Sequence, residues 1–269
     1  MPHLQCNDIE MFYEQMGIGE PVIFLHSGFS RGILAFASQI LDFQRKYTCY
    51  FPDFRGHGRT RSKSLEWSTP QHAEDIVAFM NQLQISKAHL IGYGMGGGVA
   101  LYCAINHPNR IASLTSIGQS GFVASQGSEE FEPEWLVRNE RNDFINSMIE
   151  RHMEAHRGNW QEFLRQKLRD WRTYPQLNNE QLGSIQCPTL FIAGQNDEFA
   201  PEEELKRVTN LIRDSRYVIV PECSHRPHMS RENPVFVNDI ILDFLKSLRL
   251  RMQTKSHNSS PKILPLSRE

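Results

Sequence analysis

Short apolar segments alternate with longer amphipathic segments along most of the chain. Each of the clearest apolar segments has apolar side chains at successive positions: Pro21–His26, Tyr47–Phe54, His89–Tyr93, Ile111–Ile117, Thr189–Ala193 and Tyr217–Val220. Strands that are apolar on both faces are typical of a parallel sheet with helices on either side. The alternation therefore predicts an α/β fold.

Two of the amphipathic segments are regular enough to place as helices. One begins near Thr69, which reads as a helix cap because Pro70 follows at the first helical position. The other runs from about Pro234 to Leu248. In both segments apolar residues recur every three or four positions, which places them on one face of a helix.

The alternation is interrupted over residues 123–186, which we refer to as the insertion. This stretch is helical in pattern and rich in charge, and it holds three of the four tryptophans, Trp135, Trp160 and Trp171. A helical segment of this size between two strands predicts a cap. Its tryptophans could form either the roof of a pocket or a small core of the cap itself.

The division of the chain follows from the position of the insertion. We expect a core made of residues 1–122 and 187–250, with the insertion at 123–186 as a helical cap. From residue 251 to 269 the chain is polar and contains two prolines. This composition predicts a mobile C-terminal tail.

Charge and cysteine content narrow the class of protein. The 29 Lys and Arg residues nearly balance the 31 Asp and Glu residues, so a nucleic-acid binder with a basic surplus is not expected. No apolar run approaches the ~18 residues of a membrane span, and the N-terminus lacks the pattern of a signal peptide. The five cysteines are scattered and odd in number, which favours a reducing cytoplasm over a disulfide framework or zinc site.

The segment His89–Ala104 carries the most informative motif. An apolar strand runs into a glycine-rich turn and then a helix, and Gly92-Tyr93-Gly94-Met95-Gly96 has the shape of the nucleophile elbow G-x-S-x-G. Small flanking residues are needed because strand and helix almost touch at such a turn. The same glycines could also form a dinucleotide-binding turn. That turn usually follows the first strand, and this one follows several, so its position favours the elbow.

Four further motifs accompany the elbow in a fixed order. They are Leu25–Phe29 after a strand, Asp53–Thr60 with the pattern D-x-R-G-x-G-x-[ST], Gly194–Pro201 with the pattern G-x-x-D-x-x-x-P, and Cys223–Pro227 after the last strand. Together with the elbow, this combination resembles the α/β-hydrolase superfamily over roughly Met11–Leu248. The resemblance implies a mostly parallel eight-stranded sheet flanked by helices, with a helical cap.

The resemblance also assigns site residues. The family order of nucleophile, acid and histidine falls on Gly94, Asp197 and His225. The oxyanion hole would use the backbone N–H of Met95 at a helix N-terminus. Its second donor would be Gly28 or, as second choice, Phe29. No cofactor and no metal is implied.

Position 94 departs from the family pattern because glycine has no side chain with which to attack a substrate. Glycine does suit the strained backbone of an elbow. Three interpretations are open. Gly94 is an engineered replacement of a serine, or a native residue in a protein whose chemistry is performed by His225 and Asp197 alone, or the mark of a catalytically silent binder.

His225 and Asp197 form a useful pair even without a nucleophile. A carboxylate on one ring nitrogen of a histidine fixes its tautomer and raises its basicity, so the other nitrogen can act as a general base. His228 in the same loop is a weaker candidate. His152 and His156 have a spacing that can bind metal, but they lack the remaining ligands of a metal site.

These observations predict a cytoplasmic protein that acts on a small, largely apolar ester or other acyl compound. The alternatives are a cofactor-free lyase, decarboxylase or oxygenase with the same fold, and a ligand-binding pseudoenzyme. The expected partner is a small-molecule substrate, with no nucleic acid and no membrane span. Nothing in the sequence specifies an oligomeric state.

Overall fold

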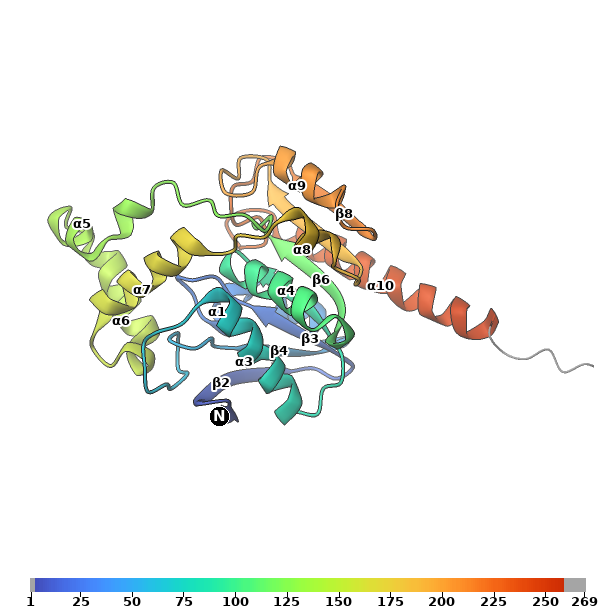
Figure 1. Ribbon diagram of the computed structural model, residues 1–269, viewed down its shortest axis with the longest axis horizontal. Coiled ribbons are helices and arrows are strands. Elements are labelled where there is room, and N and C mark those ends of the chain that lie inside the picture. The colour runs from blue at the N-terminus through green and yellow to red at the C-terminus, as the bar shows by residue number, and fades with distance from the viewer. Residues whose placement is uncertain (1–2, 259–269) are drawn as a thin grey trace, which may run out of the picture.

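The computed structural model describes residues 3–258, and for residues 252–258 it describes only the helical backbone. Within this range eight strands form a sheet in the order β1-β2-β4-β3-β5-β6-β7-β8 (Figure 1). The β1–β2 and β2–β4 pairs are antiparallel, and the pairs from β4 to β8 are parallel. The predicted α/β fold with its mostly parallel eight-stranded sheet is therefore confirmed. The strands are β1 (His3–Cys6), β2 (Ile9–Met16), β3 (Glu20–Leu25), β4 (Tyr47–Pro52), β5 (Ala88–Tyr93), β6 (Ile111–Ile117), β7 (Thr189–Gly194) and β8 (Ser215–Val220).

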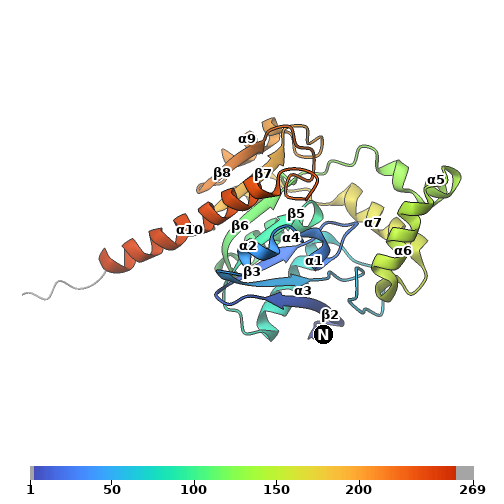
Figure 2. The ribbon, with the colours of Figure 1, turned by 180° about the vertical axis from the view of Figure 1, so that it is seen from behind.

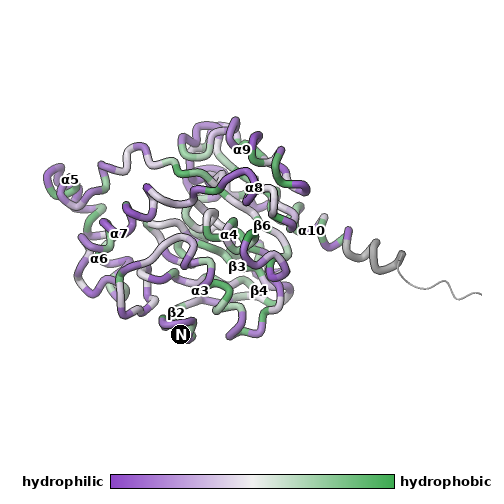
Figure 3. The backbone as a smooth tube through the Cα atoms, in the orientation of Figure 1, coloured by the Kyte–Doolittle hydropathy of each residue, from purple (hydrophilic) through white to green (hydrophobic). Residues whose placement is uncertain are grey.

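Helices cover both faces of the sheet. Alternate side chains of β3 show the two layers: Ile23 and Leu25 pack with α3, α4 and α9, whereas Val22 and Phe24 pack with α1, α2 and α10. Figures 1 and 2 show these two layers from opposite sides, and Figure 3 shows that hydrophobic residues gather in the central strands between them. The helices are α1 (Gly32–Ala35), α2 (Ile40–Phe43), α3 (Thr69–Gln82), α4 (Met95–Asn106), α5 (Pro133–Arg138), α6 (Asn142–His156), α7 (Trp160–Thr173), α8 (Asn179–Gly183), α9 (Glu202–Thr209) and α10 (Pro234–Asn258).

Two helix ends differ from the sequence prediction. The prediction that the last helix ends near Leu248 is wrong, because α10 continues to Asn258 and projects from the body (Figures 1 and 2). Residues 251–258 of the predicted tail belong to this helix, and the remainder, 259–269, lies outside the described residues. The physical reason is the absence of a helix breaker before Pro261. At the start of α3 the cap is Ser68, whose side chain accepts a hydrogen bond from Gln71 N at 3.3 Å.

The insertion between β6 and β7 is helical, as predicted, and forms a small core together with Trp67 from the segment before α3. The buried residues of this core are Trp67, Leu136, Ile145, Met148, Phe163 and Leu164. Trp135 and Trp160 pack against it, whereas Trp171 lines a pocket, so both readings of the tryptophans apply, each to different residues. From Leu177 onward the chain packs with the sheet, although the predicted boundary lies at residue 186.

Several hydrogen bonds tie the insertion to the core, and two of its buried side chains, Asp170 and His152, accept bonds from core backbone N–H groups. The carboxylate of Asp170 on α7 accepts hydrogen bonds from Thr69 N at 2.6 Å and from Thr69 Oγ1 at 2.8 Å. His152 Nδ1 on α6 accepts one from Gly58 N at 2.9 Å. Since Thr69 serves as the anchor for Asp170, its side chain is not free to cap α3.

Candidate active site

Gly94 occupies a sharp turn between β5 and α4. Its φ of 53° and ψ of −117° lie where glycine is favoured over residues with a side chain. A Cβ at Gly92 would lie 2.2 Å from Gly96 O, and one at Gly96 would lie 1.9 Å from Leu25 O. The glycines on either side of the turn are therefore required by the close approach of strand and helix, which is the geometry of the predicted elbow.

His225 and Asp197 form one hydrogen-bonded unit beside this turn. His225 Nδ1 lies 3.0 and 3.2 Å from the two carboxylate oxygens of Asp197, whose side chain is fully buried. Phe199 N and Ala200 N also donate to Asp197 Oδ1, at 2.9 and 3.2 Å. These bonds hold the carboxylate in place, and the carboxylate in turn orients the ring of His225 by its contact with Nδ1.

The other nitrogen of His225 faces the place where a side chain at position 94 would stand. A Cβ built on Gly94 would lie 3.6 Å from His225 Nε2 and 3.4 Å from Ser27 Cβ, with no closer neighbour. The elbow therefore has room for a side chain.

Gly118, which sequence analysis did not identify, makes room for the ring of His225. It directly follows β6, and a Cβ there would lie 2.8 Å from His225 Cε1.

The predicted oxyanion donors come from two segments, the start of α4 and the turn after β3. Met95 is the first residue of α4, where backbone N–H groups have no acceptor within the helix. Gly28 and Phe29 are the middle residues of a turn closed by the bond from Ser30 N to Ser27 O at 3.0 Å. All three predicted donors line the pocket, and their role in binding an oxyanion stays a prediction.

The motif at Asp53–Thr60 forms a network of hydrogen bonds behind the pocket. Asp53 accepts bonds from Gly32 N at 2.7 Å and Arg59 N at 2.9 Å. His26 Nε2 accepts a bond from Phe54 N at 2.9 Å, and burial lowers the pKa of His26 to about 3. His26 is therefore neutral at ordinary pH and serves as an acceptor that braces the loop.

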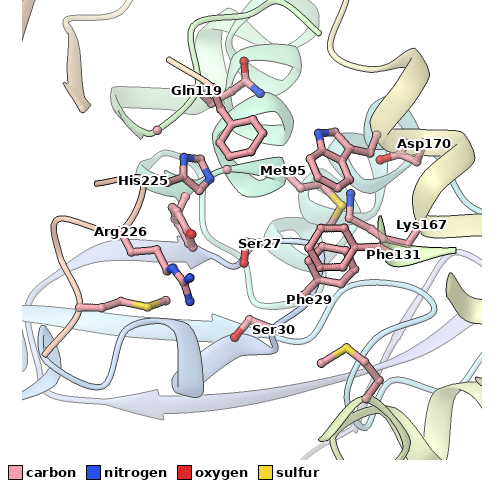
Figure 4. A pocket seen from close by; sticks show the side chains of 18 of the residues that line it. Ser27, Phe29, Ser30, Met95, Gln119, Phe131, Lys167, Asp170, His225 and Arg226 are labelled. Carbon is pink, nitrogen blue, oxygen red and sulfur yellow. The ribbon is translucent and has the colours of Figure 1, made fainter. Parts of the chain in front are cut away.

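The pocket has a volume of about 690 Å³ and lies between the sheet and the insertion. Figure 4 shows His225 on one side and Lys167 on the other, with Met95 between them. Aromatic rings form much of the wall, with centroid distances of 4.9 Å between Phe29 and Phe131 and between Phe199 and His225. The described charged residues among its lining, apart from His225, are Arg141, Arg151, Lys167, Asp170 and Arg226.

Lys167 is a buried cation in the lining of the pocket, and sequence analysis did not identify it. Its side chain is only 5% exposed, and burial lowers its pKa to about 8 although the charge of Asp170 opposes the shift. The ammonium lies 5.6 Å from the ring centre of Phe29 and 5.3 Å from that of Trp171. Sequence analysis treats a lysine in a charge-rich helix as exposed, but Lys167 lies on the buried face of α7.

The weaker histidine candidates lie away from the pocket. His228 is fully buried against α1, with Nε2 3.2 Å from Ala35 O, and His152 stacks on Phe163 at 4.4 Å. Among the residues whose side chains are described, 3–251, no group of three or more His, Cys, Asp or Glu residues is arranged to hold a metal ion. Over the same residues, none of the helices combines the length and the hydropathy that a bilayer span requires.

Comparison with known proteins gives consistent matches. A family model described as alpha/beta hydrolase fold matches residues 20–168. The chain is 26% identical to the serine hydrolase BPHL of Mus musculus over 254 residues, which covers 89% of this chain and 84% of that protein. It is 26% identical to the 2-hydroxy-6-oxo-6-phenylhexa-2,4-dienoate hydrolase of Comamonas testosteroni over 277 residues, covering 89% of this chain and 92% of that one. The crystal structure of the enol-lactonase from Burkholderia xenovorans LB400 superposes with a TM-score of 0.74 at 19% identity, covering 91% of this chain and all of that one.

Proposed function

Because the chain belongs to the α/β hydrolase fold family, we propose that it acts on a small, largely apolar ester or other acyl compound without a covalent enzyme intermediate. The hydrolase names of its relatives support this class of reaction. The observation that carries the proposal is the Asp197–His225 pair, whose free nitrogen faces the empty side of Gly94 inside the pocket. We also propose a cytoplasmic location, which the scattered cysteines favour.

The proposed step uses His225 as a general base on water. Water placed near Gly94 attacks the carbonyl carbon of the substrate and transfers a proton to His225 Nε2, while Asp197 stabilises the imidazolium that forms. The carbonyl oxygen becomes an oxyanion that accepts hydrogen bonds from Met95 N–H and the Gly28 loop. The tetrahedral intermediate then expels the alcohol, which takes the proton back from His225.

A second candidate function is ligand binding without turnover. The observation that favours it is the absence of a nucleophilic side chain at position 94, where the family mechanism requires one. The pocket, the aromatic wall and the backbone donors would serve a binder equally well.

The experiment is ester hydrolysis by the unmodified chain and by three variants, two of them at position 94. We expect slow hydrolysis of p-nitrophenyl butyrate by the unmodified chain, loss of this activity in His225→Ala, and a gain of several orders of magnitude in Gly94→Ser. Gly94→Ala is the matched control, because it adds the same Cβ without the hydroxyl. A folded Gly94→Ser protein that is no faster than Gly94→Ala would contradict the hydrolase and favour the binder.

Covalent labelling distinguishes the two states of position 94. A fluorophosphonate probe should leave the mass of the unmodified chain unchanged and should add one label to Gly94→Ser. Labelling of the unmodified chain at Ser27, the residue whose Cβ lies beside position 94, would show that the nucleophile has moved rather than disappeared.

A further inference from the structure

The wall of the pocket that comes from the insertion holds a cation whose described partners are aromatic rings rather than acceptors or acids. Among the described residues, the ammonium of Lys167 makes no hydrogen bond and no ion pair, although 95% of its side chain is covered. The nearest acid on the same helix is Asp170, but both of its oxygens are engaged by Thr69 at 2.6 and 2.8 Å. Because Lys167 lines the pocket, a ligand bound there can provide the acceptors that the surrounding protein does not.

The position of Lys167 relates it directly to the reacting centre. Its side chain crosses over Gly28: a Cβ there would lie 1.8 Å from Lys167 Cε and 2.7 Å from Nζ. The ammonium thus lies beside the loop that we expect to bind the oxyanion. Figure 4 shows Lys167 and His225 on opposite sides of Met95, with the ring of Phe29 below Lys167.

The charges around the pocket favour an anionic ligand. Arg141, Arg151 and Arg226 line it together with Lys167, and against these cations the described lining contributes one carboxylate, that of Asp170. Arg151 is itself bound to the carbonyl of Phe29, so its charge lies on the same loop as the ammonium. Since one unpartnered ammonium balances one negative charge, a monocarboxylate fits this site.

We propose that the substrate is an acyl compound that carries a free carboxylate, and that this carboxylate forms an ion pair with Lys167 while the reacting carbonyl lies between His225 and the Met95 N–H. This inference rests on the proposed function, because it names the class of substrate for the same site. The apolar chain between the two groups would lie along Phe29 and Phe131, which stack at 4.9 Å. The lowered pKa of Lys167, about 8, is in keeping with a cation that awaits its counterion, since a bound carboxylate favours the charged form.

The test is binding of two probes that differ in one charge. Monomethyl adipate carries a carboxylate and an ester, and dimethyl adipate has the same chain without the charge. By isothermal titration calorimetry at pH 7, we expect the unmodified chain to bind the monoester at least about tenfold more tightly, the effect of a hydrogen bond to a charged group. Equal affinities, or no binding of either probe, would overturn the proposal.

Variants assign the preference to one residue. Lys167→Met, which keeps the length of the side chain, should reduce the ratio of the two affinities to about one, and Lys167→Arg should keep a preference for the monoester. Lys87→Met is the matched control, since this exposed lysine precedes β5 at the opposite end of that strand from the elbow, and it should keep the full ratio. An unchanged ratio in Lys167→Met would overturn the assignment.

The unmodified chain provides a measurement that does not depend on the folding of a variant. Affinity for monomethyl adipate should fall at least about fivefold between pH 7 and pH 10 as Lys167 loses its proton, while that for dimethyl adipate should not. A flat profile for both probes would contradict the proposal. Because binding needs no turnover, selective binding together with an inactive Gly94→Ser protein would refute the hydrolase and leave the carboxylate site standing.

Discussion

The wall of the pocket formed by the core is built around backbone turns, whereas the wall formed by the insertion is built from side chains on helices. On the sheet side, the elbow at Gly94, the helix start at Met95 and the turn at Gly28 line the pocket. On the insertion side, Phe131, Lys167 and Trp171 determine shape and charge. A backbone wall fixes the type of reaction, because its geometry tolerates few substitutions. A side-chain wall selects the substrate and can change with little effect on the fold.

The largest effect that would test this division is on the sheet side. In the background of Gly94→Ser, Asp197→Asn should lower kcat by about 10³- to 10⁴-fold, because an amide no longer holds His225 in the required tautomer. Steady-state kinetics with p-nitrophenyl butyrate measure it, and exposed Asp143→Asn on α6 is the control for the same chemical change. A loss smaller than tenfold would show that the Asp197–His225 pair does not drive the reaction.

A glycine of the elbow tests how strictly the backbone wall is built. Gly96→Ala should destabilise the protein by about 3 kcal/mol or more, since its Cβ would overlap the carbonyl of Leu25 at 1.9 Å. Gly183→Ala on α8 is the matched control: its nearest neighbour would be 3.6 Å away, so the change should cost nothing measurable. Urea unfolding of both variants gives the comparison, and equal stabilities would mean that the elbow is more adaptable than its geometry indicates.

The interface between the two walls is sensitive to acid. Burial lowers the pKa values of His57, His72 and His152 well below 6.5, so the folded state cannot take up protons that the unfolded chain binds. Their contribution to stability is complete above about pH 6.5 and is lost as the pH falls below it. The free energy of unfolding should therefore be lower at pH 5 than at pH 7.5.

One of these histidines allows the acid effect to be isolated. Neither ring nitrogen of His72 has a hydrogen-bond partner among the described residues, so His72→Leu removes a titrating group without breaking a bond. Denaturant unfolding at pH 7.5 and pH 5 should show a smaller loss at pH 5 for this variant than for the unmodified chain. The same loss in both proteins would place the acid sensitivity elsewhere.

The smallest expected effect concerns the attachment of the insertion to the core. Thr69→Val removes the hydroxyl that donates to Asp170 but keeps the shape of the side chain, and it should cost about 1–2 kcal/mol. Exposed Thr173→Val on the same α7 loses only a bond to the carbonyl of Arg169 and should have little effect. If both variants unfold at the same urea concentration, the Thr69 bond does not hold the insertion in place.

The sheet could be predicted from sequence where its strands are buried on both faces. The apolar runs at β3 to β7 are of this kind, and β8 at the edge of the sheet has an apolar run although only Val220 is buried. The strands β1 and β2 give no such run, because they pair antiparallel at the other end of the sheet and mix buried with exposed residues. The predicted end of α10 near Leu248 is too early because it was placed where the apolar pattern stops. Beyond Leu248 its sequence is polar, and polarity alone does not end a helix.

The candidate site divides in the same way. Gly94, Asp197 and His225 could be placed because each belongs to a motif next to a strand, where the backbone imposes a pattern on the sequence. Lys167 and Gly118 could not be found, because nothing adjacent in sequence marks them. Their importance comes from contacts with Gly28 and His225, which lie far away along the chain.

The crossing of Lys167 over Gly28 has a consequence for how such a protein can change through evolution. A side chain at position 28 would occupy the same space as the lysine, at 1.8 Å from its Cε. Positions 28 and 167 can therefore vary only together. A relative with a larger residue at position 28 should have a short residue at position 167. Descendants of this sequence could gain a bulkier oxyanion loop only by giving up the cation above it.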